Sequence, residues 1–130
     1  MSCGGAGNLV KQATEVIVNP ANKKLQHGSG AARAIAEAAG QELVKECEAY
    51  IRKYRELQIA EVMHTTAGKL PAPIKHVMHV AGPDARLIKD PVKCFDILKE
   101  TFFNCLTYAN DVLQVGSIAI PAISSGCVIQ

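Results

Sequence analysis

The sequence has no long hydrophobic run, no block of like charge and no closely spaced pair of cysteines. No apolar stretch approaches the roughly 18 residues that a membrane-spanning helix needs. The N-terminus also lacks the basic segment followed by an apolar segment that marks a secretory signal peptide. We therefore expect no membrane span and a cytoplasmic or nuclear location.

Neither sign of charge predominates in the sequence. Fourteen Lys and Arg residues are balanced by twelve Asp and Glu, which gives a formal net charge of +2 with histidine neutral. The basic residues are scattered along the chain, so the sequence predicts no nucleic-acid or membrane surface. We expect an ordinary solvated surface of mixed charge.

The five cysteines are an odd number, lie far apart and include no Cys-x-x-Cys pair. Their density is below that of a disulfide-stabilised scaffold, so we expect reduced thiols. Cys47, Cys94 and Cys105 fall on predicted helices, where we expect them to be packed. Cys127 has no basic sequence neighbour that would lower the pKa of its thiol, and we interpret it as a small loop residue rather than a nucleophile.

The most informative stretch covers residues 15–33 and reads EVIVNPANKKLQHGSGAAR. Its consecutive apolar residues, 16–18, suit a central strand that is covered on both faces. The strand stops at Asn19 and Pro20, and a turn of small residues then leads into an alanine-rich helix. Such a turn leaves free backbone N–H groups at the positive end of a helix dipole, where phosphates often bind. The pattern alone also fits a turn that uses glycine for steric reasons only.

The whole composition predicts a single globular domain, with 48% hydrophobic and 20% charged residues over 130 positions. Apolar runs bounded by Gly, Pro or Asn indicate strands, and apolar stripes at three- and four-residue spacing indicate helices. Their alternation is typical of a layered α/β fold with ligand sites at the carboxyl ends of the strands. We expect strands over 15–19, 61–67, 76–81 and 117–123, and helices over 31–39, 41–54 and 91–110.

The two longer helices are recognised by their apolar stripes. Pro91 suits the first turn of the last helix, and Gly40 suits the stop between the first two. The stripe of the second helix consists of Leu43, Val44, Cys47, Tyr50 and Ile51. The stripe of the last helix consists of Phe95, Leu98, Phe102, Cys105, Leu106 and Ala109.

Two histidines, His76 and His79, stand in one predicted strand. Because they are three residues apart, their side chains point to opposite faces of the sheet. We therefore expect no metal there, and no metal site elsewhere in the chain.

In combination, these motifs resemble the macro domains, a family that binds ADP-ribose. The resemblance is closest to the macro domains attached to ADP-ribosyltransferases and to those of viruses. It implies a three-layer α/β/α fold with a mixed central sheet, and ADP-ribose as a ligand without any cofactor. The segments that carry it are GNL from residue 7, VIVNPANKKLQHGSGAARAIAEAAG, TTAGKLP, HVMHVAGP, the long helix and SIAIPAISSG, in that order.

The resemblance also implies a ligand site made of two loops. Asn8, with Leu9 beside it, would contact the adenine, while Asn22 and His27 would hold the distal ribose. A structural Asx turn at Asn22 and a turn role with backbone hydrogen bonds at His27 are the alternatives. The other ligand-binding positions would surround the diphosphate; they are Gly28, Ser29, Gly30 and Ala31 in the first loop, and Ser124, Ser125, Gly126, Cys127 and Val128 in the second.

Two side chains depart from the pattern of the family. Asn8 stands where the family usually has an aspartate, so the hydrogen bond to the adenine amine becomes a neutral one, weaker by about 1 kcal/mol. Ala32 stands where some hydrolytic members carry an aspartate that activates water, which removes that general base.

The ends of the chain depart from the family as well. We interpret residues 1–6 as a start segment or expression remnant, and residues 7–130 as one incomplete macro domain that lacks the first strand and the last helix and strand. The two missing strands would lie beside the segment 117–123, which would then expose Ile118, Ile120 and Ile123 at a sheet edge. We expect such a domain to pair with another copy or with a partner.

Three functions remain open at this point. The first is a module that binds ADP-ribose or mono-ADP-ribosylated proteins. The second is a mono-ADP-ribosyl-protein hydrolase with Asn22 and His27 as catalytic residues: they orient the distal ribose while a water held against the diphosphate attacks the anomeric carbon, without a protein carboxylate. The third is a truncated interaction fragment that binds no nucleotide.

Overall fold

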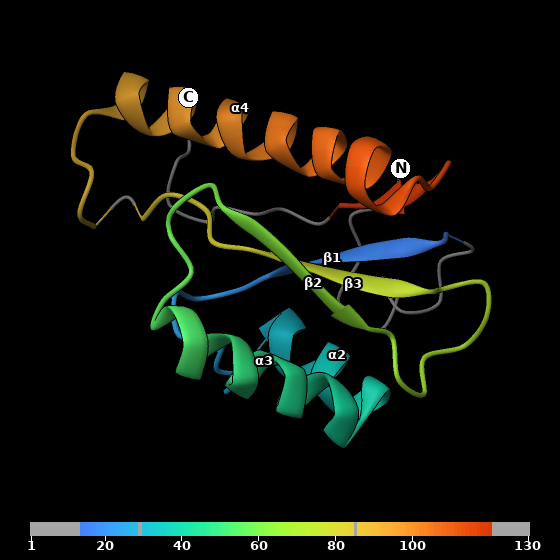
Figure 1. Cartoon of the computed structure of the whole chain (residues 1–130). Helices are drawn as coiled ribbons and strands as arrows, with labels where there is room; N and C mark the ends of the chain where they lie inside the picture. The colour runs from blue at the N-terminus through green and yellow to red at the C-terminus, as the bar shows by residue number, and fades with distance from the viewer. Residues whose placement is uncertain (1–13, 29, 85, 121–130) are drawn as a thin grey trace.

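The computed structural model describes residues 14–28, 30–84 and 86–120. These residues form a four-stranded sheet with helices on both of its faces (Figure 1). None of the described helices combines the length and the apolar character that a membrane crossing requires. The elements are β1 (Val16–Pro20), α2 (Gly30–Ala39), α3 (Gln41–Tyr54), β2 (Val62–Thr66), β3 (His76–Val80), α4 (Pro91–Tyr108), a π-helical turn (Ala109–Leu113) and β4 (Ile118–Ala119).

The sheet is mixed, with the strand order β2-β3-β1-β4. β1 lies parallel to β3 on one side and to β4 on the other, so that Ile17 is opposite both Val77 and Ala119. β2 runs antiparallel to β3. Val16, Ile17 and Val18 are all fully buried. The central, doubly covered position predicted from three consecutive apolar residues is therefore confirmed.

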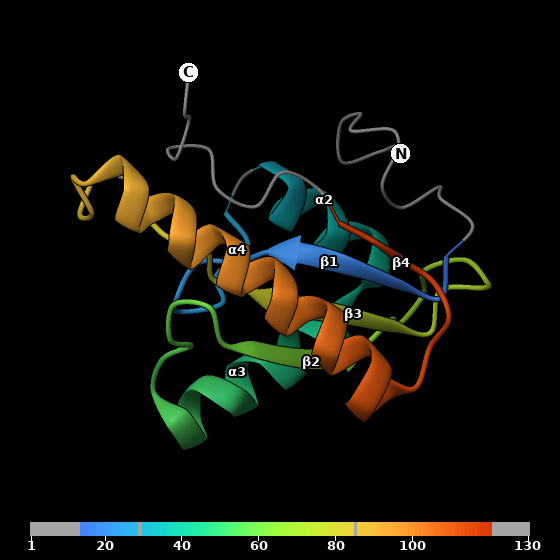
Figure 2. The same ribbon diagram turned by 90° about the horizontal axis from the view of Figure 1, so that it is seen from above.

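Two helices, α2 and α3, cover one face of the sheet, and α4 covers the other (Figure 1). Seen from above, α4 crosses over the strands (Figure 2). The core beneath α2 and α3 includes Ile17, Ile35, Leu43, Cys47 and Val77. The core beneath α4 includes Val16, Val18, Met78, Val80 and Cys105. This three-layer α/β/α arrangement with a mixed sheet is the fold that the resemblance implies.

The sequence predicts the start of α4 correctly but not its end. The helix begins as predicted at Pro91, where the side chain of Asp90 accepts hydrogen bonds from the backbone N–H groups of Val92 at 3.0 Å and Lys93 at 3.4 Å. At the other end the chain continues beyond the predicted stop at residue 110, as a π-helical turn that ends at Leu113.

The predicted stripe of α4 is wrong at two positions, Phe95 and Leu106. These side chains are 39% and 54% exposed, whereas Leu98, Phe102, Cys105 and Ala109 pack in the core. At about 100° per residue, Phe95 and Leu106 each lie roughly 60–80° around the helix axis from the centre of the buried stripe. Apolar character alone did not distinguish the two groups.

The last predicted strand, 117–123, is described only up to residue 120, so Ile123 lies outside the described residues. Within the described sheet, β4 forms an edge. Ile118 and Ile120 are half-buried against the core beneath α4. The edge position expected for Ile118 and Ile120 is thus found in the described sheet, and the two side chains are half-buried because they pack against the core beneath α4.

Two of the cysteines behave as predicted and one does not. Cys47 and Cys105 are buried free thiols. Burial raises the pKa of Cys47 to about 12 and that of Cys105 to about 11, so neither is a thiolate at neutral pH. Cys94 is also buried but is disulfide-bonded. The prediction of reduced thiols throughout is wrong here, because sequence spacing does not show which thiols a fold brings together.

Candidate functional site

The loop between β1 and α2 holds most of the described candidate residues. Because β1 and β3 are parallel, their carboxyl ends meet at one edge of the sheet, and this loop begins there. Leu25 anchors the loop: it adopts a φ of 53° and inserts its side chain into the core beneath α2 and α3. The carbonyl oxygen of Lys23 accepts a hydrogen bond from the backbone N–H of Leu57 at 2.7 Å, which ties the loop to the segment after α3.

Asn22 organises this loop through its side-chain amide. Its Oδ1 accepts hydrogen bonds from the backbone N–H groups of Lys24 at 3.1 Å and Gln26 at 3.0 Å. Its Nδ2 donates to the carbonyl oxygen of Gln26 over a longer distance of 3.4 Å. The Asx-turn role is thus present in the structure. The residue is exposed, and Nδ2 has a second N–H group that can bind a ligand.

The glycine turn opens directly into the N-terminus of α2. Gly30 adopts a φ of 62°, in the left-handed region that favours glycine. A Cβ added at Gly28 would meet no atom within 4 Å, so space is open above this position. The first turn of α2 contains no acidic residue that would repel an anion, and the positive end of a helix dipole attracts one. Ala31 is half-buried in this turn, and the next residue, Ala32, is a buried alanine that offers no base.

His27 stands at the end of the loop with an unusual environment. Neither ring nitrogen is accessible to solvent, and neither has a hydrogen-bond partner among the described residues. Burial lowers the pKa of the ring, so it is neutral at neutral pH. His27 lines two surface hollows, of about 490 and 500 Å³. The alternative role, a turn residue held by backbone hydrogen bonds, finds no support in the ring, because neither nitrogen bonds a described backbone group.

A chain of buried polar groups lies beneath the loop, and the sequence analysis did not identify it. Asn19 donates a hydrogen bond from Nδ2 to Nδ1 of His79 at 2.9 Å. The Nε2 of His79 therefore carries the proton, and it lies 3.0 Å from Oγ1 of Thr65, which donates to the carbonyl oxygen of Thr66. Burial lowers the pKa of His79 to about 3. Polar residues inside otherwise apolar strands are the signal that could have identified this chain.

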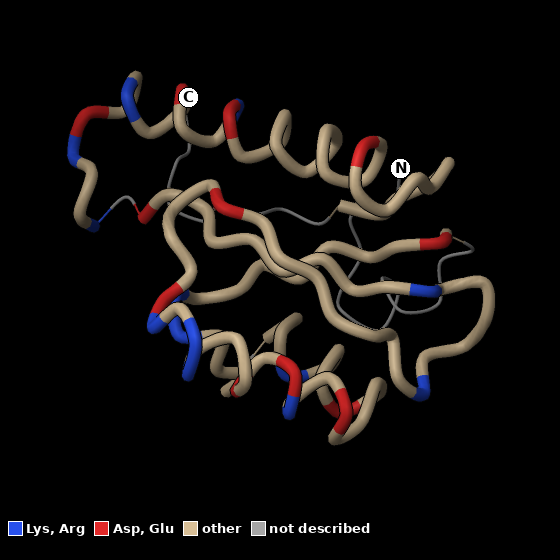
Figure 3. The backbone as a smooth tube through the Cα atoms, in the orientation of Figure 1, with Lys and Arg blue, Asp and Glu red and all other residues tan. Residues whose placement is uncertain are grey.

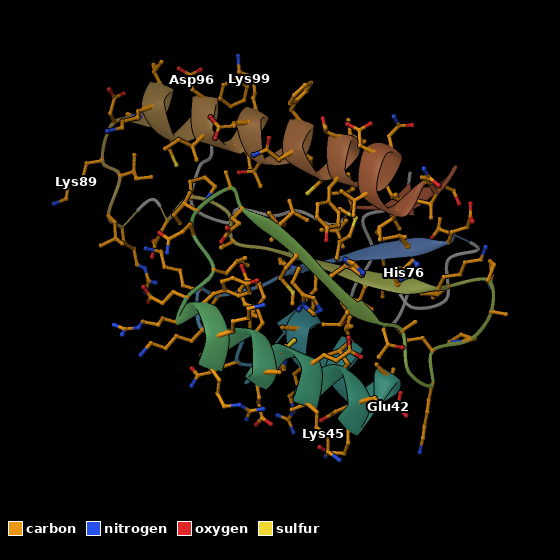
Figure 4. The ribbon with its side chains drawn as sticks, in the orientation of Figure 1. Glu42, Lys45, His76, Lys89, Asp96 and Lys99 are labelled. Atoms are coloured by element: carbon orange, nitrogen blue, oxygen red, sulfur yellow. The ribbon has the colours of Figure 1, made fainter. Side chains whose placement is uncertain are left out.

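The two histidines of β3 do point to opposite faces, as predicted. His79 faces α3, where its Nε2 lies 3.9 Å from Sγ of Cys47. His76, at the start of β3 (Figure 4), is on the α4 side: its ring is 5.4 Å from that of His64, which shares a 2.6 Å hydrogen bond with the hydroxyl of Tyr108 in α4. No three metal-ligating side chains gather anywhere in the described part of the chain.

The remaining predicted site residues lie outside the described residues. The structure therefore brings together Asn22, His27, Gly28, Gly30 and Ala31, which form one loop and the start of α2. The predicted site residues outside the described part of the chain are Asn8, Leu9, Ser29, Ser124, Ser125, Gly126, Cys127 and Val128.

Fold and loop together define a three-layer α/β domain with an anion-compatible turn at the carboxyl edge of a mixed sheet. Residues 18–129 match the sequence family described as the Macro domain. The chain therefore belongs to the macro domain family.

Three relatives show the range of this match. An uncharacterized protein of Sulfurisphaera tokodaii is 41% identical over 120 residues, which cover 92% of this chain and 62% of that protein. Protein mono-ADP-ribosyltransferase PARP14 of Homo sapiens is 36% identical over 120 residues, covering 92% of this chain and 6% of that protein. Replicase polyprotein 1a of a murine coronavirus is 32% identical over 126 residues, covering 92% of this chain and 3% of that protein. Relatives of the ADP-ribosyltransferase and viral types, which the resemblance implied, are thus both found.

Solved structures agree with this family. An Oceanobacillus iheyensis macrodomain with ADP is similar at a TM-score of 0.80 and 34% identity, over 93% of this chain and 63% of that one. A Trypanosoma brucei macrodomain in complex with ADP is similar at a TM-score of 0.68 and 26% identity, over 86% of this chain and 42% of that one. The chain spans less than two thirds of the length of these structures and of the first curated relatives.

Proposed function

We propose that this domain binds ADP-ribose, either free or as the mono-ADP-ribosyl group of a modified protein. The observation that carries the proposal is the loop that begins after β1, which combines an exposed amide at Asn22, open space at Gly28 and the N-terminus of α2, whose first turn has no acidic residue. ADP-ribose presents ribose hydroxyls and a diphosphate. The remaining N–H of the Asn22 amide can donate to a ribose hydroxyl, and fixed N–H groups at a helix N-terminus suit the diphosphate.

The Asx turn at Asn22 supports this function rather than competing with it. Because Oδ1 is held by two backbone N–H groups, the side chain is already fixed before a ligand arrives. A group fixed in advance loses little conformational entropy on binding. A solved O. iheyensis macrodomain mutant contains ADP-ribose, and at 34% identity and a TM-score of 0.80 it supports the choice of ligand.

Binding is favoured over hydrolysis by the side chains around the loop. Ala32 is a buried alanine, and no described carboxylate forms a hydrogen bond with Asn22 or His27. The hydrolase is the second candidate, and the unpartnered ring of His27 beside the loop is the observation that favours it. In that function Asn22 and His27 would orient the distal ribose for attack by water.

Titration calorimetry of the chain with ADP-ribose and with ADP tests the binding function. Asn22→Asp keeps the oxygen that holds the Asx turn but removes the Nδ2 donor. We expect this variant to bind ADP-ribose about fivefold more weakly relative to ADP, because ADP has no distal ribose and the substitution removes one hydrogen bond. No heat and no thermal shift with millimolar ADP-ribose would overturn the proposal.

A second pair of variants tests the anion-binding turn. Gly28→Glu and Gly28→Gln place side chains of equal size where a Cβ meets no atom within 4 Å. The glutamate should weaken ADP-ribose binding about tenfold more than the glutamine does, because it brings a negative charge to the diphosphate. Equal affinities of the two variants would place the diphosphate elsewhere.

A separate assay tests the hydrolase. Release of label from a mono-ADP-ribosylated protein, faster with the unchanged chain than with Asn22→Asp, would identify the hydrolase instead.

A further inference from the structure

Five basic side chains that are separated in the sequence gather at one end of the molecule. We call them the basic cluster: Lys23, Lys24, Arg52, Lys53 and Arg55. The first two belong to the loop after β1, and the other three end α3 or follow it directly. The hydrogen bond from the Leu57 N–H to the Lys23 carbonyl oxygen brings the two segments together. Figure 3 shows the blue segments meeting at the C-terminal end of α3.

The charges of the basic cluster are available to a partner. Four of its side chains are exposed and Lys23 is half-buried. None of the five forms an ion pair with a described residue, whereas Arg33, Lys75, Arg86 and Lys99 each have an acidic partner. Lys53 lies over the ring of its neighbour Tyr54, at 5.2 Å from the centroid. Unpaired charges of one sign in a small area attract an oppositely charged partner.

A hollow of about 500 Å³ joins the basic cluster to the ribose side of the proposed ligand site. Lys24 and Arg52 contribute its positive charge, and Glu48 contributes one acid. Its apolar lining comes from Leu25, Val44 and Ile51, and its far side reaches His27. The same hollow thus combines apolar side chains, two cations and the predicted ribose-binding histidine.

We propose that the basic cluster and this hollow bind an acidic segment of the protein that carries the mono-ADP-ribosyl group. The inference rests on the proposed function. In the proposed site His27 holds the distal ribose, and His27 also lines the hollow, so a polypeptide attached to that ribose can leave the ligand site through it. Carboxylates of the segment pair with Arg52 and Lys24, and its aliphatic carbons pack on the apolar floor.

The acids around the cluster favour a peptide over a nucleic acid as the occupant. Glu48 lines the same hollow, and Glu56 directly follows Arg55. A nucleic-acid backbone carries a charge at every nucleotide and would have to pass these carboxylates. A peptide carries separate carboxylates that can meet the cations and avoid the acids.

The test uses synthetic peptides that carry one ADP-ribose through a non-hydrolysable linkage, flanked either by glutamates or by glutamines. The variant Arg52→Gln/Lys53→Gln removes two charges from the cluster with side chains that suit a helix. The control Lys89→Gln/Lys93→Gln removes two exposed charges, one just before α4 and one in its first turn, on the other side of the sheet (Lys89 in Figure 4). Each protein is titrated with both peptides, free ADP-ribose, an unmodified glutamate peptide and an oligonucleotide of equal charge.

At low ionic strength the unchanged chain should bind the glutamate peptide about tenfold more tightly than the glutamine peptide, and salt should reduce this preference. Arg52→Gln/Lys53→Gln should abolish the preference and leave binding of free ADP-ribose within about twofold, since neither residue contacts the nucleotide in the proposed site. The Lys89/Lys93 control should keep the preference.

Each other result has a defined meaning. Equal binding of the two modified peptides by the unchanged chain overturns the inference, and so does an equal loss in the control variant. An oligonucleotide that binds more tightly than the glutamate peptide overturns it in favour of nucleic acid. If free ADP-ribose does not bind, the proposed function fails. The unmodified glutamate peptide then tests the cluster alone: binding that Arg52→Gln/Lys53→Gln removes supports the surface, and no binding overturns it.

Discussion

Asn19 and His79 are polar side chains inside an apolar sheet, and both are fully buried. They lie directly opposite each other on neighbouring parallel strands, which allows the 2.9 Å hydrogen bond between them. The protonated Nε2 of His79 is then directed at Thr65. A second proton on His79 would remove the acceptor that Asn19 needs and would charge a group without access to water. The folded protein therefore requires the neutral ring.

This requirement predicts a pH dependence of stability. The pKa of His79 is about 3 in the folded state, against about 6.5 for an unfolded histidine. Between these values the unfolded chain binds one more proton than the folded chain, so stability should fall as the pH drops below about 6.5, by up to about 1.4 kcal/mol per pH unit. His27 and His64, whose pKa values are also lowered by burial, act in the same direction.

Urea unfolding of the chain and of His79→Gln, from neutral pH to about pH 4, measures this contribution. The glutamine cannot take up a proton, so the pH slope of its unfolding free energy should be smaller by about one proton. The slopes are compared rather than the absolute stabilities, because the substitution also changes the hydrogen bonds to Asn19 and Thr65. Equal slopes for the two proteins would show that His79 does not have a lowered pKa in the folded state.

At the scale of elements, the end of α2 is held against the loop after β2. Gly68 in that loop adopts a φ of 57°, and a Cβ built on it would lie 2.3 Å from the carbonyl oxygen of Ala39. The same oxygen accepts a hydrogen bond from the backbone N–H of Lys69 at 2.8 Å. The contact is between two backbones, so no flexible side chain can move aside.

Gly68→Ala should therefore destabilise the fold by about 2–4 kcal/mol, through both the left-handed backbone and the clash with Ala39. The matched control is Gly28→Ala, where the added methyl group meets nothing within 4 Å. That substitution should change stability by no more than about 0.5 kcal/mol. Chemical denaturation of the two variants measures the difference, and similar losses for both would contradict the proposed backbone contact.

The elements themselves could be predicted from the sequence because each has a local signal. Three consecutive apolar residues defined the central strand β1, and Pro91 defined the start of α4. The buried chain of Asn19, His79 and Thr65 depends instead on the register of three strands, and a sequence pattern does not specify register between distant strands. The basic cluster escaped prediction for the same reason, since its two segments meet only in the folded chain.

The candidate site divides in the same way. The turn over 27–30 could be predicted, because small residues between a strand and an alanine-rich helix are a local pattern. The dual use of Asn22 could not, because which of its amide atoms bonds the loop depends on the backbone path between Lys24 and Gln26. The isolation of the His27 ring also depends on tertiary packing and has no sequence signal.

At the scale of the whole molecule, the two helical layers are unequal. Two helices cover one face of the sheet, and α4 with its π-helical turn covers the other (Figure 1). The outer side of α4 exposes large apolar side chains, with Val92 and Phe103 each 66% and Leu106 54% exposed. β4 is an edge strand of the described sheet. An apolar helix surface and a sheet edge both favour association.

We expect the chain to self-associate through this layer, so sedimentation velocity should show a larger species as the protein concentration rises. Phe103→Lys/Leu106→Lys should shift the protein to the monomer without loss of helical signal, because both side chains are exposed and a charge on each opposes their burial between two copies. Leu87→Lys is the matched control, since Leu87 is 74% exposed but precedes α4. If the unchanged chain stays monomeric at high concentration, self-association is contradicted. If Leu87→Lys has the same effect as the double substitution, α4 is not the contact surface.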